Sequence, residues 1–158
     1  MRAITTLALV AALLSCSRSQ PDEAGQPPTP CRDRTAQAND STLPSNVVGV
    51  PWQWIRFTTP VEQIDVDGPE RYTVQFEAGG RAALRADCNR GTTSYSVGRD
   101  RRITFKPIAL TRAMCPPGSL SERFAREVGR ATSYFIKDGD LFLELPADSG
   151  TLRFKRQD

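Results

Sequence analysis

The run RYTVQFEAGGRAALRA, which spans residues 71–86, decides the fold of this chain. From 72 to 76, apolar side chains alternate with polar ones, which is the period of a strand that buries one face. Gly79 and Gly80 then supply a two-residue turn, because tight hairpin turns need backbone with positive φ, and apolar alternation resumes after them. The stretch therefore predicts an antiparallel β-hairpin.

A second hairpin and several short strands follow the same pattern. Apolar runs at 134–136 and 141–145 flank the turn pair Asp138-Gly139. Further strands are predicted at 54–58, 93–97, 103–106, 108–110 and 151–155. Because turn residues recur at intervals of about eight to twelve positions, we expect an all-β sandwich or barrel.

One segment has a helical period instead. The tetrapeptide SLSE at 119–122 has the form of a capping box, and Leu120, Phe124 and Val128 follow at four-residue spacing. We expect a helix of about twelve residues that ends near 129–130. Its apolar stripe would close one end of the barrel, and a partner-binding face is the alternative.

The composition excludes several kinds of active site. The chain has 158 residues, a formal net charge of +3 and no histidine. Serine–histidine triads, cysteine–histidine dyads and HExxH zinc helices are therefore impossible. We expect a protein that is not an enzyme and has no catalytic residue, metal site or cofactor. A small-ligand-binding barrel and a hydrolase that uses carboxylates alone are the alternatives.

Residues 1–15 have the organisation of an export signal. Arg2 precedes an apolar run of about ten residues, which is too short to span a bilayer. The run ends in LLSC at 13–16, which resembles the lipobox of bacterial lipoproteins. The resemblance implies cleavage before Cys16 and lipid on its sulfur, and Ser17 after it implies sorting to the periplasmic face of the outer membrane. An ordinary secretory signal is the alternative.

The next stretch, 16–46, is rich in proline and polar residues and has no aromatic side chain. Such a composition buries too little apolar surface to offset its ordering entropy. We therefore predict a lipid-bearing flexible tether over 16–46 and a β-domain over 47–158.

Four motifs carry a family resemblance. They are RYTVQFEAGGR at 71–81, ADCNRG at 86–91 with Tyr95, LTRAMCP at 110–116 and DGDL at 138–141. Together they resemble the META domain (HslJ-like) family over roughly 52–156. The resemblance implies a mainly β fold with one α-helix, in a partly open antiparallel β-barrel, and lipoproteins associated with heat shock and antibiotic tolerance.

The resemblance implies structural roles, and no catalytic ones, for certain motif positions: Trp54, Asp87, Asn89, Thr111 and Arg112. The short polar side chains of Asp87 and Asn89 predict an Asx turn or a buried hydrogen-bond network at a strand end, and a ligand-contact role is the alternative. The first strand begins PWQW at 51–54, where many relatives have Gly-Thr-Trp, so its register stays open.

The cysteines of the domain are expected to pair. Cys88 and Cys115 would lie in an oxidising compartment, which favours a disulfide. A bridge over about 27 residues would contribute roughly 3.5 kcal/mol in the chain-entropy model. A redox-active or metal-binding pair is the alternative. Cys31, in the tether, is either a free thiol or an intermolecular link.

Positive charge is concentrated in one part of the chain. Residues 81–130 contain eleven Lys or Arg and four Asp or Glu, whereas 51–80 contain two and five. A basic face would bind an anionic surface or an unknown acidic envelope protein, and a solvated Arg-rich surface is the alternative. The predicted partners are thus the membrane, through Cys16, and an envelope protein or anionic surface, but not nucleic acid. We expect a non-catalytic envelope lipoprotein that carries a stress- or antibiotic-tolerance-linked binding module.

Overall fold

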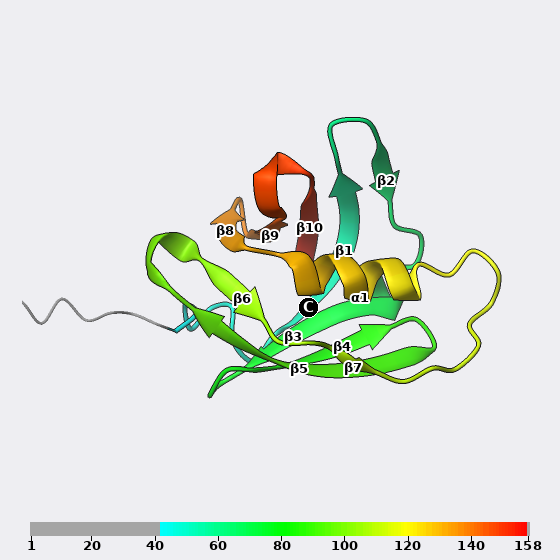
Figure 1. Cartoon of the computed structure of the whole chain (residues 1–158), viewed down its shortest axis with the longest axis horizontal. Helices are drawn as coiled ribbons and strands as arrows, with labels where there is room; N and C mark the ends of the chain where they lie inside the picture. Colours follow the sequence, from blue (N-terminus) through cyan, green and yellow to red (C-terminus); the bar gives the residue numbers. More distant parts are fainter. Residues whose placement is uncertain (1–41, 158) are drawn as a thin grey trace, which may run out of the picture. The chain divides into compact units, whose positions relative to one another are not determined.

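The computed structural model describes residues 42–157, and in this part of the chain it has ten β-strands and one α-helix (Figure 1). The predicted fold class, mainly β with a single helix, is confirmed. The predictions for the export signal, Cys16, Cys31 and most of the tether lie outside the described residues. Within 42–157, no helix is long and apolar enough to cross a membrane.

The strands and helices follow one another along the chain as β1 (Pro51–Thr58), β2 (Gln63–Asp65), η1 (Pro69–Arg71), β3 (Tyr72–Glu77), β4 (Arg81–Ala86), β5 (Asn89–Val97), η2 (Arg99–Arg101), β6 (Ile103–Phe105), β7 (Ala109–Leu110), α1 (Ser121–Arg130), β8 (Ser133–Lys137), β9 (Asp140–Glu144), η3 (Pro146–Asp148) and β10 (Thr151–Arg156).

Both predicted hairpins are present. In the β3–β4 pair, Val74 lies opposite Leu84, and the connecting Gly79 and Gly80 have φ of 88° and 81°. In the β8–β9 pair, the turn residue Gly139 has φ of 85°. The positive φ values explain why glycine occupies these turns.

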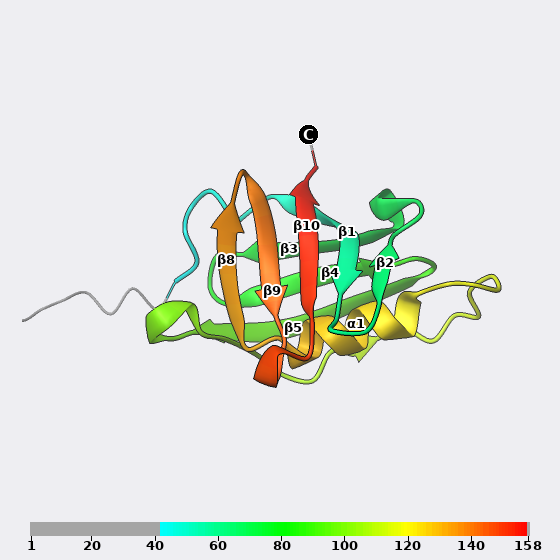
Figure 2. The same cartoon turned by 90° about the horizontal axis from the view of Figure 1, so that it is seen from above.

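The strands form a nearly closed antiparallel barrel with one unsealed seam. Their order is β6-β5-β4-β3-β1-β10-β9-β8, while β2 pairs with β1 and β7 with β5. In Figure 2, β8, β9, β10, β1 and β2 lie side by side, and β3, β4 and β5 run across behind them. The two end strands, β6 and β8, meet near a single antiparallel bridge between Arg102 and Ser133 among the described residues. This confirms the partly open barrel.

A β-bulge settles the register of the first strand. The pairing of β1 with β10 shifts between Trp54 and Arg56. The extra residue returns Phe57 to the interior, where Trp52 and Trp54 also lie.

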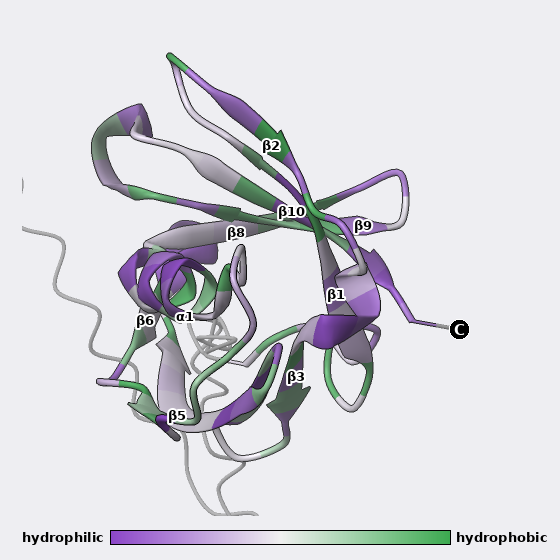
Figure 3. Ribbon diagram, turned by 90° about the vertical axis from the view of Figure 1, so that its right-hand side faces the viewer, coloured by the Kyte–Doolittle hydropathy of each residue, from purple (hydrophilic) through white to green (hydrophobic). Residues whose placement is uncertain are grey.

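Helix α1 covers the seam and supplies part of the core. Figure 3, in which α1 is seen end-on, places the helix between β8 and β6. Phe124 and Val128 are fully buried, and the Phe124 ring stacks on Trp54 with a centroid distance of 5.3 Å. The apolar stripe therefore belongs to the core, as predicted, rather than to a partner-binding face.

The predicted capping box forms only in part: the Ser119 hydroxyl accepts from the Ser121 N–H at 3.3 Å. The helix begins at Ser121, one residue later than a Ser119 cap requires, and its N-cap residue, Leu120, makes no side-chain cap hydrogen bond. The Leu120 N–H instead donates to the Tyr72 hydroxyl at 3.0 Å. The helix has ten residues and ends at Arg130, close to the predicted end.

The packed part of the chain begins before residue 47. Leu43, which lies within the predicted tether, is buried in the same core cluster as Val47. Val48 then forms a parallel bridge with Phe76. The domain thus includes a short stretch of what was predicted to be spacer.

Candidate functional site

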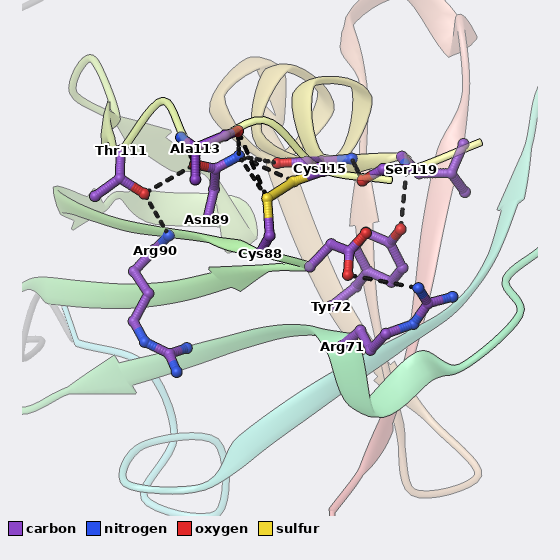
Figure 4. The surroundings of a disulfide bond; sticks show 12 residues. Arg71, Tyr72, Cys88, Asn89, Arg90, Thr111, Ala113, Cys115 and Ser119 are labelled. Atoms are coloured by element: carbon purple, nitrogen blue, oxygen red, sulfur yellow. Dashed lines mark hydrogen bonds and ion pairs between the residues drawn. A yellow bond between two sulfur atoms is a disulfide. The ribbon is translucent and has the colours of Figure 1, made fainter. Parts of the chain in front are cut away.

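A disulfide joins the β4–β5 turn to the segment that precedes α1 (Figure 4). Cys88 and Cys115 are bonded, with a Cα–Cα distance of 5.5 Å, so the predicted pairing is confirmed. Both sulfurs are used in this bond and are not free to ligate a metal. Within residues 42–157, no three side chains of the His, Cys, Asp and Glu types form a group that could hold a metal ion.

Asn89 is the centre of the hydrogen-bond network around this disulfide. Its buried side-chain amide donates to the carbonyl oxygen of Ala113 at 3.2 Å and to the Ser121 hydroxyl at 3.1 Å. Its oxygen accepts from the Ala113 N–H at 2.8 Å and from the Thr111 hydroxyl at 2.9 Å. One side chain therefore fixes both the loop that precedes α1 and the start of α1, which is the role that a buried, fully bonded amide can serve.

Thr111 continues the pairing of β5 beyond the end of β7. Its backbone N–H donates to the carbonyl oxygen of Arg90 at 2.9 Å, and its hydroxyl accepts from the Arg90 N–H at 3.0 Å. Figure 4 shows Thr111, Asn89 and Ala113 in one connected group beside the disulfide. The stretch 111–115 is thus held on β5 without being part of a regular strand.

Asp87 occupies the turn between β4 and β5 with a φ of 58°. Its backbone N–H donates to the carbonyl oxygen of Arg71 at 2.7 Å, and its carboxylate lies 3.5 Å from the Arg71 guanidinium. Trp54 lies elsewhere, fully buried in the core, with its indole N–H on the carbonyl oxygen of Arg56. The structure therefore brings Asp87, Asn89 and Thr111 together around the disulfide and keeps Trp54 in the interior.

An open groove of about 960 Å³ lies between residues 105–113 and α1. Its floor includes Ile108, which packs between the sheet and the helix. A Cβ atom on Gly91 of β5 would lie 3.1 Å from Ile108 Cγ2, and one on Gly129 of α1 would lie 3.4 Å from Ile108 Cδ1. The two glycines therefore leave the room that Ile108 needs to close the bottom of the groove.

The rim of the groove is basic. Besides one carboxylate, Glu122, four cationic side chains line it: Lys106, Arg112, Arg126 and Arg130. All four come from the basic stretch 81–130 that the sequence singled out. Arg112, the last of the predicted motif positions, is thus an exposed rim residue and not a member of the disulfide network.

A buried carboxylate positions two of these arginines. Glu127 is 4% exposed and lies 3.0 Å from Arg126 Nε and 2.9 Å from an Arg130 guanidinium nitrogen. The two arginine side chains are about half exposed. Since each arginine has five N–H donors, both keep donors for a ligand after binding Glu127.

The groove itself was not predicted from the sequence. The charge asymmetry indicated basic side chains, but nothing local to 105–113 indicates that it faces α1. The two available signals were a glycine inside a helical pattern, Gly129, and a glycine near a strand start, Gly91, since such glycines often mark close approach of another segment.

Comparisons with known proteins agree with this architecture. The META domain model matches residues 45–158. The crystal structure of a DUF4847 family protein from Bacteroides vulgatus is similar, with a TM-score of 0.51 and 13% sequence identity, and the match covers 71% of this chain and 96% of that one. That likeness concerns the fold alone. No protein with a curated description matches the chain. Because the family model covers well over half of its length, the chain belongs to the META domain family.

Proposed function

We propose that this META domain protein is a non-catalytic binding module of the bacterial envelope, anchored by lipid on Cys16. Its partner is negatively charged and binds in the groove between 105–113 and α1. The observation that carries the proposal is the charge of the groove rim, which has four cationic side chains and one carboxylate. Such a concentration of one sign of charge in a concave site attracts anionic partners.

The packing of the barrel supports a binding site at the seam rather than in the interior. Trp54, Tyr72 and Phe124 are each less than 2% exposed and pack ring against ring. These rings fill space that a ligand-binding barrel would leave for its ligand. A carboxylate-only hydrolase needs two facing carboxyl groups, whereas Glu122 is the one carboxylate among the residues that line the groove.

The envelope location is supported by the amino-terminal sequence. The lipobox-like LLSC at 13–16 supports attachment of lipid to Cys16, and two or more acyl chains give stable membrane anchoring. The disulfide is of the kind that persists in oxidising compartments such as the periplasm. The likeness to META-domain lipoproteins supports a role in envelope stress or antibiotic tolerance.

Fractionation tests the anchor. Cys16→Ser removes the sulfur that would carry the lipid, so we expect the variant to move from the membrane to the soluble periplasmic fraction. Cys31→Ser is the matched control, since it removes a nearby tether thiol, and we expect it to stay with the membrane. Membrane association of Cys16→Ser equal to that of the control would contradict the anchor.

Site-specific crosslinking in intact envelopes tests the binding site. A photo-crosslinking residue at Ala109, exposed on the groove wall, is expected to give adducts that disappear at high salt and in an Arg112→Gln background. Val61, which is 93% exposed and lies outside the groove lining, is the control position. Adducts of equal yield from both positions, insensitive to Arg112→Gln, would contradict binding in the groove.

A further inference from the structure

Strand β7 has one edge without a neighbour. On one side it pairs with β5, with Leu110 opposite Gly91 and Ala109 opposite Thr92. Within residues 42–157, no strand pairs with its other side. Folded proteins usually cover or block such an edge, because its N–H and C=O groups can pair with another chain.

The hydrogen bonds between β7 and β5 show which residues face β5 and which face the free edge. Thr111 directs its backbone N–H to Arg90, and Ala109 is two residues earlier, so both face β5. Alternate residues of a strand present their backbone groups on opposite edges. Leu110 and Arg112 therefore direct their N–H and C=O groups away from β5, and both residues belong to the groove lining.

The side chains of the groove complement a peptide with alternating chemistry. Ile108, Ala125 and Gly129 provide small and apolar lining, while Arg112 and Arg126 contribute guanidinium groups at the rim. Successive side chains of an extended peptide point to opposite sides. A segment in which apolar or small residues alternate with carboxylates would thus contact the lining with one set and the arginines with the other.

Resting on the proposed function, we propose that the groove accepts an extended acidic segment of a partner protein, added as a further strand on the free edge of β7. Charge complementarity favours an acidic occupant. The strand edge and apolar lining favour a peptide over a lipid headgroup or lipopolysaccharide phosphate, which would use the cations alone. Strand addition of this kind takes affinity from main-chain hydrogen bonds and specificity from alternate side chains.

The probe is an eight-residue peptide in which Glu alternates with Val or Thr, titrated by calorimetry into the full chain in detergent. Two N-methylated versions of the peptide are compared. Each carries methyl groups on the backbone nitrogens of alternate residues, so that one version has one edge of the extended peptide blocked and the other version has the opposite edge blocked. We expect one version to bind about tenfold more weakly than the parent and the other to bind like the parent. We also expect Arg112→Gln to weaken binding about fivefold. Arg85→Gln, an exposed arginine of β4 outside the groove lining, should leave binding unchanged.

Each other outcome overturns a specific part of the inference. If both N-methylated peptides bind like the parent while Arg112→Gln still weakens binding, strand addition is wrong and the basic groove stands. If vesicles of anionic phospholipid or inorganic phosphate bind in an Arg112-dependent way and the peptide does not, the peptide partner is wrong and the anionic site stands. If no anionic probe binds, or Arg85→Gln and Arg112→Gln act alike, the groove is not the binding site and the proposed function fails with it.

Discussion

Two regions of the domain hold α1 in place by different means. The aromatic cluster, which consists of Trp54, Tyr72 and Phe124, grips the inner face of the helix by burial and ring packing. The loop clamp, which consists of Cys88, Asn89 and Cys115, holds the start of the helix and the loop before it by a covalent bond and directed hydrogen bonds. The first region buries apolar area, and the second adds constraint with little burial of apolar area.

The difference separates stability from shape. Apolar burial is not directional, so the aromatic cluster stabilises the fold but specifies little about the loop outside it. The stretch 107–120, apart from β7, has no ladder of its own and takes its path from the loop clamp. Since the same stretch forms one wall of the groove, the loop clamp sets the shape of the proposed binding site.

Removing a ring from the aromatic cluster is expected to have the largest effect. Phe124→Ala leaves a cavity among three aromatic partners and should lower the free energy of unfolding by about 3–5 kcal/mol, measured by urea unfolding. Glu122→Ala, at an exposed position of the same helix, is the control and should change it by less than about 0.5 kcal/mol. A Phe124→Ala variant as stable as this control would mean that the aromatic cluster does not hold the helix.

Removing the disulfide of the loop clamp is expected to lower the free energy of unfolding by nearly as much, but by a different physical mechanism. Cys88→Ser with Cys115→Ser releases a closed loop of 27 residues. The chain-entropy model gives a loss of roughly 3.5 kcal/mol, most of it through the unfolded state. Hydrogen exchange of the backbone amides at 111–120 should also accelerate more than that of β3 and β4.

Reductant supplies the control for the disulfide. Wild-type protein in reductant should match the double variant in free energy of unfolding, and the double variant should not respond to reductant. A double variant as stable as the oxidised wild type would mean that the disulfide does not contribute to the free energy of unfolding.

The same contrast explains what the sequence could predict. The hairpins of β3–β4 and β8–β9 were predictable because alternation and turn residues such as Gly79 and Asp138 are local signals. Strand β2 was not predicted, because its three residues are partly or fully exposed and become a strand only by pairing with β1. The capping box is incomplete because other groups around the helix start have distant partners: the Leu120 N–H bonds to Tyr72, and the Ser121 hydroxyl to Asn89.

Several residues of the candidate site could be predicted from the sequence, but the groove that they form could not. The pairing of Cys88 with Cys115 followed from the compartment, and the basic rim followed from the charge count. Neither the position of Ile108 between β5 and α1 nor the buried Glu127 behind two arginines has a signature in the sequence, because both depend on packing between segments. A glutamate in the middle of an amphipathic helix normally lies on the solvent-exposed face, so the sequence does not indicate that Glu127 is buried.

Tyr95 combines the two kinds of support and gives the smallest expected effect. Its ring packs edge-on to Phe76 with a centroid distance of 5.2 Å, and its hydroxyl donates to the carbonyl oxygen of Glu77. Burial, and secondarily the nearby Tyr134, raise the pKa of Tyr95 above its ordinary value of 10.0. The unfolded chain therefore loses this proton at lower pH than the folded chain, so the stabilisation is complete below pH 10 and is lost as the pH rises through the folded-state pKa.

Tyr95→Phe should consequently cost about 1 kcal/mol at pH 8, because the hydroxyl hydrogen bond is lost. The cost should be smaller above pH 10, because ionisation of Tyr95 in the unfolded chain then destabilises the wild type but not the variant. Urea midpoints of both proteins at several alkaline pH values, in a Cys16→Ser and Cys31→Ser background that prevents thiol exchange, measure the difference. A difference that stays constant across pH 10 would mean that Tyr95 ionises as freely in the folded chain as in the unfolded one. Burial of the Tyr95 hydroxyl would then have no effect on the pH dependence of stability.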